Sequence, residues 1–287
     1  MLKFAILGYP LGHSISPQIH QAGFESLGID ATYEILETEP ENFLERINFL
    51  KKNNYSGVNV TIPLKVKMAM FVEEVDKNAS LAGAINTVKI NSDKSFSGFN
   101  TDIAGFKSAI PFNDILKDKE VTILGTGGAS RAVIVACVEL GVKKINFYTR
   151  NIPNTLEFVN FFRNLAPQID FTLNQYETIN DLSTTDMLVN TTPIGMKGHS
   201  ADTSPINEKI LATLKNSAIV YDIVYNPTET ILLKLAKARG LATVSGLDML
   251  VLQAVEAQKI WFNQTPNFEK MKQAGLKALK SYHIDYM

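Results

Sequence analysis

Two ionisable side chains, Lys65 and Asp102, stand where strands are predicted to end. Lys65 closes the run NVTIPLK at 59–65, where Pro63 must end a strand near Ile62 because proline cannot continue a sheet ladder. Asp102 closes the run GFNTD at 98–102, after another predicted strand. A lysine and a carboxylate that meet at strand ends can move a proton to or from a reacting oxygen. A solvated surface charge is the alternative for Lys65 taken alone.

A glycine-rich segment follows a predicted strand and precedes a predicted helix: Gly125-Thr126-Gly127-Gly128-Ala129-Ser130. This order is the context that a dinucleotide-binding loop requires. Gly125 permits a tight turn, and Gly127 lets the backbone approach a pyrophosphate at the helix N-terminus. No Gly-Lys-Ser/Thr sequence follows, which argues against a P-loop nucleoside triphosphatase. The segment therefore predicts dinucleotide binding, with a glycine-rich turn that binds nothing as the alternative.

The next predicted strand bears on the choice between NAD and NADP. It ends in Thr149-Arg150-Asn151, at the distance from the loop where NAD-selective sites carry an acid for the ribose hydroxyls. No acid stands there, and Arg150 could pair with a 2′-phosphate and stack on adenine. The pattern favours NADP, whereas a plain surface charge is the alternative for Arg150.

Short apolar runs alternate with amphipathic segments along the chain, which predicts an α/β fold with a parallel sheet covered on both faces. Ser16 is expected to cap the first helix, with Pro17 at its first position. Residues 84–100 are expected to form a hairpin. Strands are expected at 2–7, 32–37, 57–62, 121–124, 144–148, 186–190 and 218–222, and helices at 17–27, 42–52, 130–140, 156–165, 230–239 and 248–263.

Size and composition narrow the function classes. The 287 residues are enough for two domains, and 45% are hydrophobic and 20% charged. A net charge of -1 gives no general attraction to nucleic acid or to an anionic membrane. The single cysteine, Cys137, can form no disulfide within the chain, which fits the cytoplasm. The four histidines lack metal-ligand spacing, so no metal site is expected.

The motifs together resemble the shikimate dehydrogenase family nearly from end to end. The resemblance rests on residues 8–17, 59–65, 83–87, 100–102, 125–130, 190–196, 222–227 and 246–250, with Gln253. It implies two α/β domains: a substrate-binding domain of residues 1–102 and 245–287, and a Rossmann-type NADP-binding domain of residues 103–244. It also implies NADPH-dependent, reversible reduction of 3-dehydroshikimate to shikimate, by a monomer or a homodimer.

The resemblance carries roles residue by residue. It makes Lys65 and Asp102 the catalytic pair and assigns substrate binding to Ser14, Ser16, Thr61, Asn86, Tyr225 and Gln253. The two serines and Tyr225 would hold the substrate carboxylate, and the other three the ring hydroxyls. The implied cofactor-binding residues are Gly125, Thr126, Gly127, Gly128, Ala129, Thr149, Arg150, Thr191, Met196, Gly246 and Met249.

The chain also departs from the family pattern. Ile103 stands where the family often has glycine, and residues 152–155 lack the second base that usually follows the arginine. Two other functions also stay open: a relative that acts on quinate as well as shikimate, often with NAD, and a catalytically silent module that senses a cofactor or a metabolite.

Overall fold

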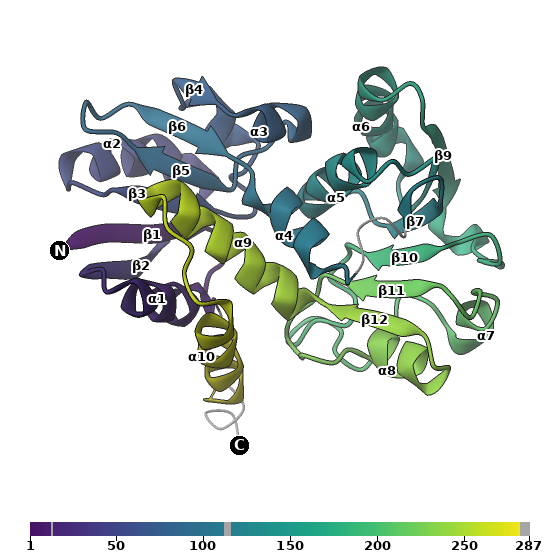
Figure 1. Ribbon diagram of the computed structural model, residues 1–287. Helices are drawn as coiled ribbons and strands as arrows, with labels where there is room; N and C mark the ends of the chain where they lie inside the picture. Colours follow the sequence, from purple (N-terminus) through teal and green to yellow (C-terminus); the bar gives the residue numbers. More distant parts are fainter. Residues whose placement is uncertain (13, 112–115, 282–287) are drawn as a thin grey trace. The chain divides into compact units, whose positions relative to one another are not determined.

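The computed structural model describes residues 1–12, 14–111 and 116–281 and divides into two compact units (Figure 1). Unit 1 consists of Met1–Gly105 and Leu250–Met287, and unit 2 of Phe106–Met249. Both boundaries fall inside helices, α4 (Thr101–Ala109) and α9 (Gly246–Phe262). Each unit contains one six-stranded sheet, so the predicted two-domain α/β fold class is confirmed.

The sheet of unit 1 is mixed. Its strand order is β2-β1-β3-β5-β6-β4, with bounds Ala31–Glu37, Leu2–Gly8, Gly57–Val60, Thr87–Ile90, Phe96–Phe99 and Glu74–Val75. β2, β1 and β3 run parallel, whereas β5 is antiparallel to β3 and to β6, as expected for the hairpin at 84–100. Its further helices are α1 (Ser16–Leu27), α2 (Phe43–Lys52), α3 (Lys77–Ala82) and α10 (Phe268–Ser281).

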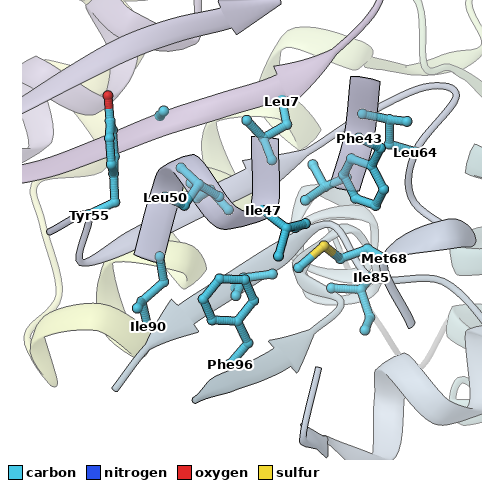
Figure 2. Close-up of a cluster of buried hydrophobic side chains, with 14 of the residues drawn as sticks. Leu7, Phe43, Ile47, Leu50, Tyr55, Leu64, Met68, Ile85, Ile90 and Phe96 are labelled. Carbon is cyan, nitrogen blue, oxygen red and sulfur yellow. The ribbon is translucent and has the colours of Figure 1, made fainter. Parts of the chain in front are cut away.

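Both faces of this sheet are covered, as the alternation along β1 shows. Phe4 and Ile6 pack in one cluster with Phe24 of α1 and Trp261 of α9. Leu7 points to the other face, into the cluster that includes residues of α2 (Figure 2). Because side chains alternate across a strand, a β1 that is apolar at nearly every position must be buried on both sides.

The sheet of unit 2 is entirely parallel, with strand order β12-β11-β10-β7-β8-β9. This is the order of a doubly wound dinucleotide-binding fold, in which the strand order reverses between two central strands, here β7 and β10. The bounds are β7 Glu120–Leu124, β8 Lys144–Thr149, β9 Asp170–Gln175, β10 Met187–Asn190, β11 Ile219–Asp222 and β12 Ala242–Ser245.

Four further helices accompany this sheet: α5 (Gly128–Glu139), α6 (Ile152–Leu165), α7 (Glu208–Leu211) and α8 (Ile231–Ala238). Leu188 and Val220 pack against Leu232 and Leu233 of α8 in a single buried cluster. Short 3-10 turns occupy Pro40–Asn42, Lys67–Met70 and Tyr176–Thr178. Among the described residues, no helix combines the length and the apolar character needed to span a membrane.

The structure corrects several expected element boundaries. Ser16 is not the cap of α1: Ile15 holds that position without a side-chain cap bond, and Ser16 is the first helical residue. β3 ends at Val60, two residues before Ile62, where Pro63 was expected to end it. The reason is that residues 61–64 already form a turn, in which Leu64 N donates to Thr61 O at 2.9 Å. The predictions missed β4, β9, β12, α3, α4, α7 and α10.

Candidate active site

The topology of unit 1 collects the predicted polar residues at one sheet edge. β1 and β3 are parallel, so the segments that follow them, with Ser14, Ser16, Thr61 and Lys65, leave the sheet at the same side. β5 is antiparallel to β3, which puts Asn86, just before β5, at that side too. β6 is antiparallel to β5 and therefore delivers residues 100–102 there.

Lys65 and Asp102 form the ion pair that the sequence predicts. Lys65 Nζ lies 2.6 Å from Asp102 Oδ2, and the side chains are 14% and 11% exposed. The pair is thus largely withdrawn from water. A charge-assisted hydrogen bond is stronger in such a buried position than in water. The turn that carries Lys65 is tied to the hairpin because Ile85 N donates to Lys65 O (2.9 Å).

The start of α4 sets the direction of the Asp102 side chain. Asn100 Oδ1 accepts from Asp102 N at 3.2 Å, the arrangement of a helix N-cap, while Asn100 Nδ2 donates to Ala84 O at 2.9 Å. The carboxylate therefore stands in the first helical turn, where the helix dipole favours a negative charge. Asn100 thereby joins α4 to the segment before β5.

Asn86 holds the second carboxylate oxygen. Its Nδ2 donates to Asp102 Oδ1 at 2.8 Å and to Thr101 Oγ1 at 3.0 Å, and its Oδ1 accepts from Thr101 N at 2.7 Å. Gln253 of α9 joins the same group, since Thr101 Oγ1 donates to Gln253 Oε1 at 3.3 Å. The structure therefore brings together four predicted site residues, Lys65, Asp102, Asn86 and Gln253.

The two serines of the first motif lie next to each other. Ser14 and Ser16 are 9% and 8% exposed, and Ser14 Oγ accepts from Ser16 N at 3.4 Å. Thr61 lies beside β1, because its backbone N donates to Leu7 O at 2.8 Å. A Cβ at Gly8 would stand 2.4 Å from Thr61 Cγ2, so this close approach requires glycine.

In unit 2 the glycine loop has the predicted place between β7 and α5. Gly125 has φ +91°, a conformation that favours glycine. Gly127 caps α5, and a Cβ at Gly127 or at Gly128 would meet no atom within 4 Å. Ser130, which replaces the usual small residue, donates from Oγ to Gly127 O at 2.5 Å and so closes the loop. Thr126 and Ala129 complete this partly open segment.

Thr191 joins β10 to the glycine loop at the reversal point of the sheet. Its Oγ1 donates to Leu124 O at 2.7 Å. Of the other predicted cofactor residues of unit 2, Met249 is buried and Met196 is 39% exposed. A Cβ at Gly246 would lie 2.2 Å from Ile223 O, so the first residue of α9 must be glycine.

Arg150 directly follows β8 and is exposed, so its guanidinium is accessible from solvent. Thr149, just before it, is buried and shares a hydroxyl contact with Thr155 (3.2 Å). Glu177, which follows β9, is a neighbour of Arg150 that was not predicted from the sequence. The pKa of Glu177 is lowered, first by its hydrogen bonds with its own backbone and Gln175, and to a smaller degree by the Arg150 charge.

Asp222, the last residue of β11, hydrogen-bonds to three other segments of unit 2. The loop that follows β11 contains Tyr225, which is partly buried. The Asp222 carboxylate accepts from Asn190 Nδ2 (2.9 Å), Thr230 Oγ1 (2.7 Å) and Val224 N (3.1 Å). Burial raises the pKa of Asp222 to about 6, against the opposite effect of these three donors. From the sequence, Asp222 was predicted only as part of the motif at 222–227.

Asp222 should make the stability of the protein depend on pH. Its pKa is higher in the folded chain than the ordinary 3.8, so its contribution is fully present below 3.8 and is lost as the pH rises through about 6. Relative to Asp222→Asn, the wild-type protein should lose on the order of 2–3 kcal/mol of unfolding free energy between about pH 4 and pH 7. Urea unfolding of both proteins at the two pH values measures this difference, and parallel pH profiles would contradict it.

The described residues contain no group of three or more His, Cys, Asp or Glu side chains that could hold a metal ion. Cys137 is buried in α5, where burial raises the pKa of its thiol to about 12. A thiol with so high a pKa is a poor nucleophile. At the sheet edge of unit 1, Lys65, Asp102 and their neighbours offer proton transfer and hydrogen bonding.

Comparisons with known proteins agree with these motifs. Residues 6–88 match the model of the shikimate dehydrogenase substrate binding domain, and residues 246–274 match that of the shikimate 5'-dehydrogenase C-terminal domain. The NADP(+) shikimate dehydrogenase of Prochlorococcus marinus (strain MIT 9515) is 38% identical over 280 residues, which cover 96% of this chain and 97% of that protein.

Two solved structures are similar over nearly the whole chain. Shikimate 5-dehydrogenase from Thermus thermophilus, in complex with NADP(H) and shikimate, has a TM-score of 0.84 at 32% identity, and the match covers 97% of this chain and 100% of that one. Ligand-free 5-ketofructose reductase of Gluconobacter sp. strain CHM43 has a TM-score of 0.87 at 27% identity, with coverages of 96% and 98%. On its sheet order, its motifs and relatives of this identity over this length, the chain belongs to the shikimate dehydrogenase family.

Proposed function

We propose that this chain is an NADP-dependent shikimate dehydrogenase, which reversibly reduces 3-dehydroshikimate to shikimate on the route to chorismate and the aromatic amino acids. The observation that carries the proposal is the pair Lys65–Asp102, 2.6 Å apart and supported by Asn86, Thr101 and Gln253. A metabolite-sensing module would have no use for a withdrawn acid–base pair of this kind.

Lys65 supplies the proton of the reaction. The cofactor, when bound, supplies the hydride that the ketone carbon accepts. As the C=O electron pair moves to oxygen, the Lys65 ammonium stabilises this charge and donates a proton to it. The alcohol leaves, and solvent returns a proton to Lys65. In the reverse direction neutral Lys65 accepts the hydroxyl proton. Asp102 aims Lys65 through Oδ2 and is itself held at Oδ1 by Asn86.

The other substrate contacts follow from side-chain chemistry. Ser14, Ser16 and Tyr225 offer neutral hydroxyl donors to the substrate carboxylate, which they can hold without burying a second charge. Thr61, Asn86 and Gln253 offer hydrogen bonds to ring hydroxyls. Asn86 and Gln253 stand in the same network as the catalytic pair, so the groups that bind the ring and those that move the proton share their supports.

The residues of unit 2 suit NADP. The open space at Gly127 and Gly128 leaves room for a pyrophosphate at the start of α5, whose first turn contains no acidic residue. Thr126, Ala129 and the other predicted cofactor residues would line the loop and the reversal point. The domain roles follow: residues 1–102 with 245–287 bind the substrate, and residues 103–244 bind the cofactor.

The proposal also includes a cellular compartment and an oligomeric state. We place it in the cytoplasm, where NADPH is available and where a chain with one buried cysteine needs no oxidising compartment. It would work there as a monomer or a homodimer on a small-molecule substrate, without nucleic acid or membrane.

A spectrophotometric assay at 340 nm tests the proposal. Shikimate, quinate and 5-ketofructose (the last with the reduced cofactor) are each measured with NADP and with NAD. The proposed function predicts the highest kcat/KM for shikimate with NADP. A preference for quinate with NAD, or for 5-ketofructose, would replace this function by that of a relative, and no turnover with any pair would favour a silent module.

Replacing Ser16 by alanine should raise the KM for shikimate more than it lowers kcat. The substrate carboxylate is charged in the ground state and in the transition state alike, so its hydroxyl partner supplies uniform binding. Because Ser16 is not the cap of α1, the Tm of the Ser16→Ala protein should stay near that of wild type. Ser14→Ala should behave alike in kinetics, and exposed Ser80→Ala is the matched control. A lower Tm with unchanged kinetics would contradict the binding role of Ser16.

Replacing Arg150 by alanine should weaken NADP binding selectively. The loss of a charge-assisted contact with the 2′-phosphate should cost about 1.5–3 kcal/mol, which is roughly ten- to a hundredfold in the Kd for NADP. The Kd for NAD should change little. Titration of both cofactors by fluorescence checks this, with exposed Arg163→Ala as the matched control. An equal loss for both cofactors would show that Arg150 does not read the phosphate.

A further inference from the structure

We propose that the buried hydroxyls of Thr87 and Thr101 position the reaction centre by holding two amide side chains, Asn86 and Gln253, in the orientations that neighbouring backbone groups set. This inference rests on the proposed function and assigns a positioning role to two hydroxyls that have no part in substrate binding or proton transfer there. Thr87 and Thr101 are 0% and 1% exposed, so neither hydroxyl can meet a substrate directly. Their oxygens lie 3.1 Å apart, and each also contacts the Asn86 amide.

The backbone decides which way the Asn86 amide faces. Thr101 N, which can only donate, lies 2.7 Å from Asn86 Oδ1. The amide nitrogen is therefore on the other side, where it donates to Asp102 Oδ1 at 2.8 Å and to Thr101 Oγ1 at 3.0 Å. An amide turned by 180° would set its oxygen against the carboxylate and its nitrogen against an N–H, and both contacts would be repulsive.

Each threonine hydroxyl has one proton, and the surrounding contacts decide where it goes. Thr87 Oγ1 accepts from Asn59 Nδ2 at 3.0 Å and donates to Asn86 Oδ1 at 3.0 Å. Thr101 Oγ1 accepts from Asn86 Nδ2 and has two oxygens within reach of its proton, Asn86 Oδ1 at 3.2 Å and Gln253 Oε1 at 3.3 Å. Asn86 Oδ1 already accepts from Thr101 N and Thr87 Oγ1, so we assign the proton to Gln253 Oε1. The hydrogen bonds thus run in one direction, from Asn59 to Gln253.

This direction fixes what Gln253 can present. Its Oε1 is engaged by Thr101, and its Nε2 donates one hydrogen to Leu250 O at 2.7 Å. The second Nε2 hydrogen can only be given to an acceptor, such as the oxygen of a ring hydroxyl. Leu250 O and Thr101 together therefore leave Gln253 a free N–H to donate. Thr87 keeps the Asn86 carbonyl occupied, so that Asn86 remains a donor to Asp102.

Asn59, the first residue of this network, is also fixed by hydrogen bonds. Tyr33 Oη donates to Asn59 Oδ1 at 2.7 Å, and Asn59 Nδ2 also donates to Asn86 O at 3.3 Å. Asn59 belongs to β3, and the register of the sheet pairs it with Thr87 of β5. The positions of both hydroxyls therefore derive from the sheet and the start of α4, which are regular elements, and not from loops.

The test uses Thr87→Val and Thr101→Val, which keep shape and remove the hydroxyl, beside Thr87→Ser and Thr101→Ser, which keep it. Thr122→Val is the matched control, because Thr122 is equally buried in a strand and shares a 2.7 Å hydroxyl contact with Thr185. Each valine variant should lower kcat/KM for shikimate at least about tenfold, whereas the serine variants and the control stay within about threefold. The Kd for NADP should not change.

A double-mutant cycle separates positioning from plain structural support. In the background of Asn86→Ala, Thr87→Val should cost no more than about twofold, because the side chain through which it acts is gone. If a valine variant does not fold, the alanine variant at that position replaces it under the same thresholds.

The outcomes decide between the two proposals. Valine variants that resemble the control, serine variants that fail to restore kcat/KM, or an undiminished loss in the Asn86→Ala background would each overturn the positioning role while shikimate turnover by the wild type still stands. A wild-type chain without activity on shikimate would overturn the proposed function and this role with it.

Discussion

Replacing Asp102 by asparagine is expected to lower kcat about ten- to a hundredfold. Asp102 accepts at both oxygens, from Lys65 Nζ (2.6 Å) and from Asn86 Nδ2 (2.8 Å). Asparagine has one acceptor oxygen, so whichever way it turns, its NH₂ group must face one of these two donors. The cost of one lost hydrogen bond to a charged group, about 1.5–3 kcal/mol, sets the size of the effect. Steady-state kinetics with 3-dehydroshikimate and NADPH measure it.

The exposed Asp30→Asn, also in unit 1, controls for a change in net charge and should leave kcat unchanged. Lys65→Ala combined with Asp102→Asn should be less impaired than the product of the two single losses, because Asp102 acts mainly by aiming Lys65. Losses that multiply would instead give Asp102 a role of its own, independent of the lysine.

The sequence predicted that Lys65 and Asp102 meet, but it did not predict most of the side chains that hold them in place. Lys65 and Asp102 could be recognised because each ends a short motif after a strand, where local patterns are strong. Their contact also depends on β5 and β6 being antiparallel, which the hairpin at 84–100 predicted. The parallel sheet of unit 2 was predictable for a similar reason, since strands there are mostly separated by helices, as in β7-α5-β8-α6-β9.

Contacts between distant parts of the chain were not predictable from one sequence. Thr101 and Gln253 lie 152 positions apart, and only the folded chain shows that their side chains meet. Glu177 was missed near Arg150 because β9, which leads to it, is a strand with few apolar residues, DFTLNQ. A half-exposed strand of this composition carries too weak an alternation to be recognised.

Local rules also failed where tertiary contacts compete with them. Ser16 before a helical pattern suggests an N-cap, yet the helix begins at Ser16 itself, and Ser14 supplies the acceptor for its backbone N–H. Helix α4 was missed because its sequence, TDIAGFKSA, contains a central glycine and has little amphipathic pattern. Both errors lie at the site, where the backbone serves the placement of functional groups.

Replacing Lys65 by alanine is expected to have the largest effect on activity, because it removes the proposed general acid. Such a loss typically lowers kcat about 10²–10⁴-fold. The charge of Lys65 matters most when the ketone oxygen becomes anionic, so the KM for 3-dehydroshikimate should change far less than kcat. Lys65→Arg should not restore turnover, since a guanidinium keeps the charge but does not release its proton.

Lys67→Ala is the matched control, two residues along the same segment, where Lys67 Nζ donates to Pro40 O at 2.7 Å. The most direct measurement is kcat of purified, folded Lys65→Ala with NADPH and 3-dehydroshikimate, next to wild type and Lys67→Ala. The account predicts a loss of at least about a hundredfold for Lys65→Ala alone, with a Tm close to wild type. A kcat within a few-fold of wild type would contradict it, because the proton would then have to come from another group.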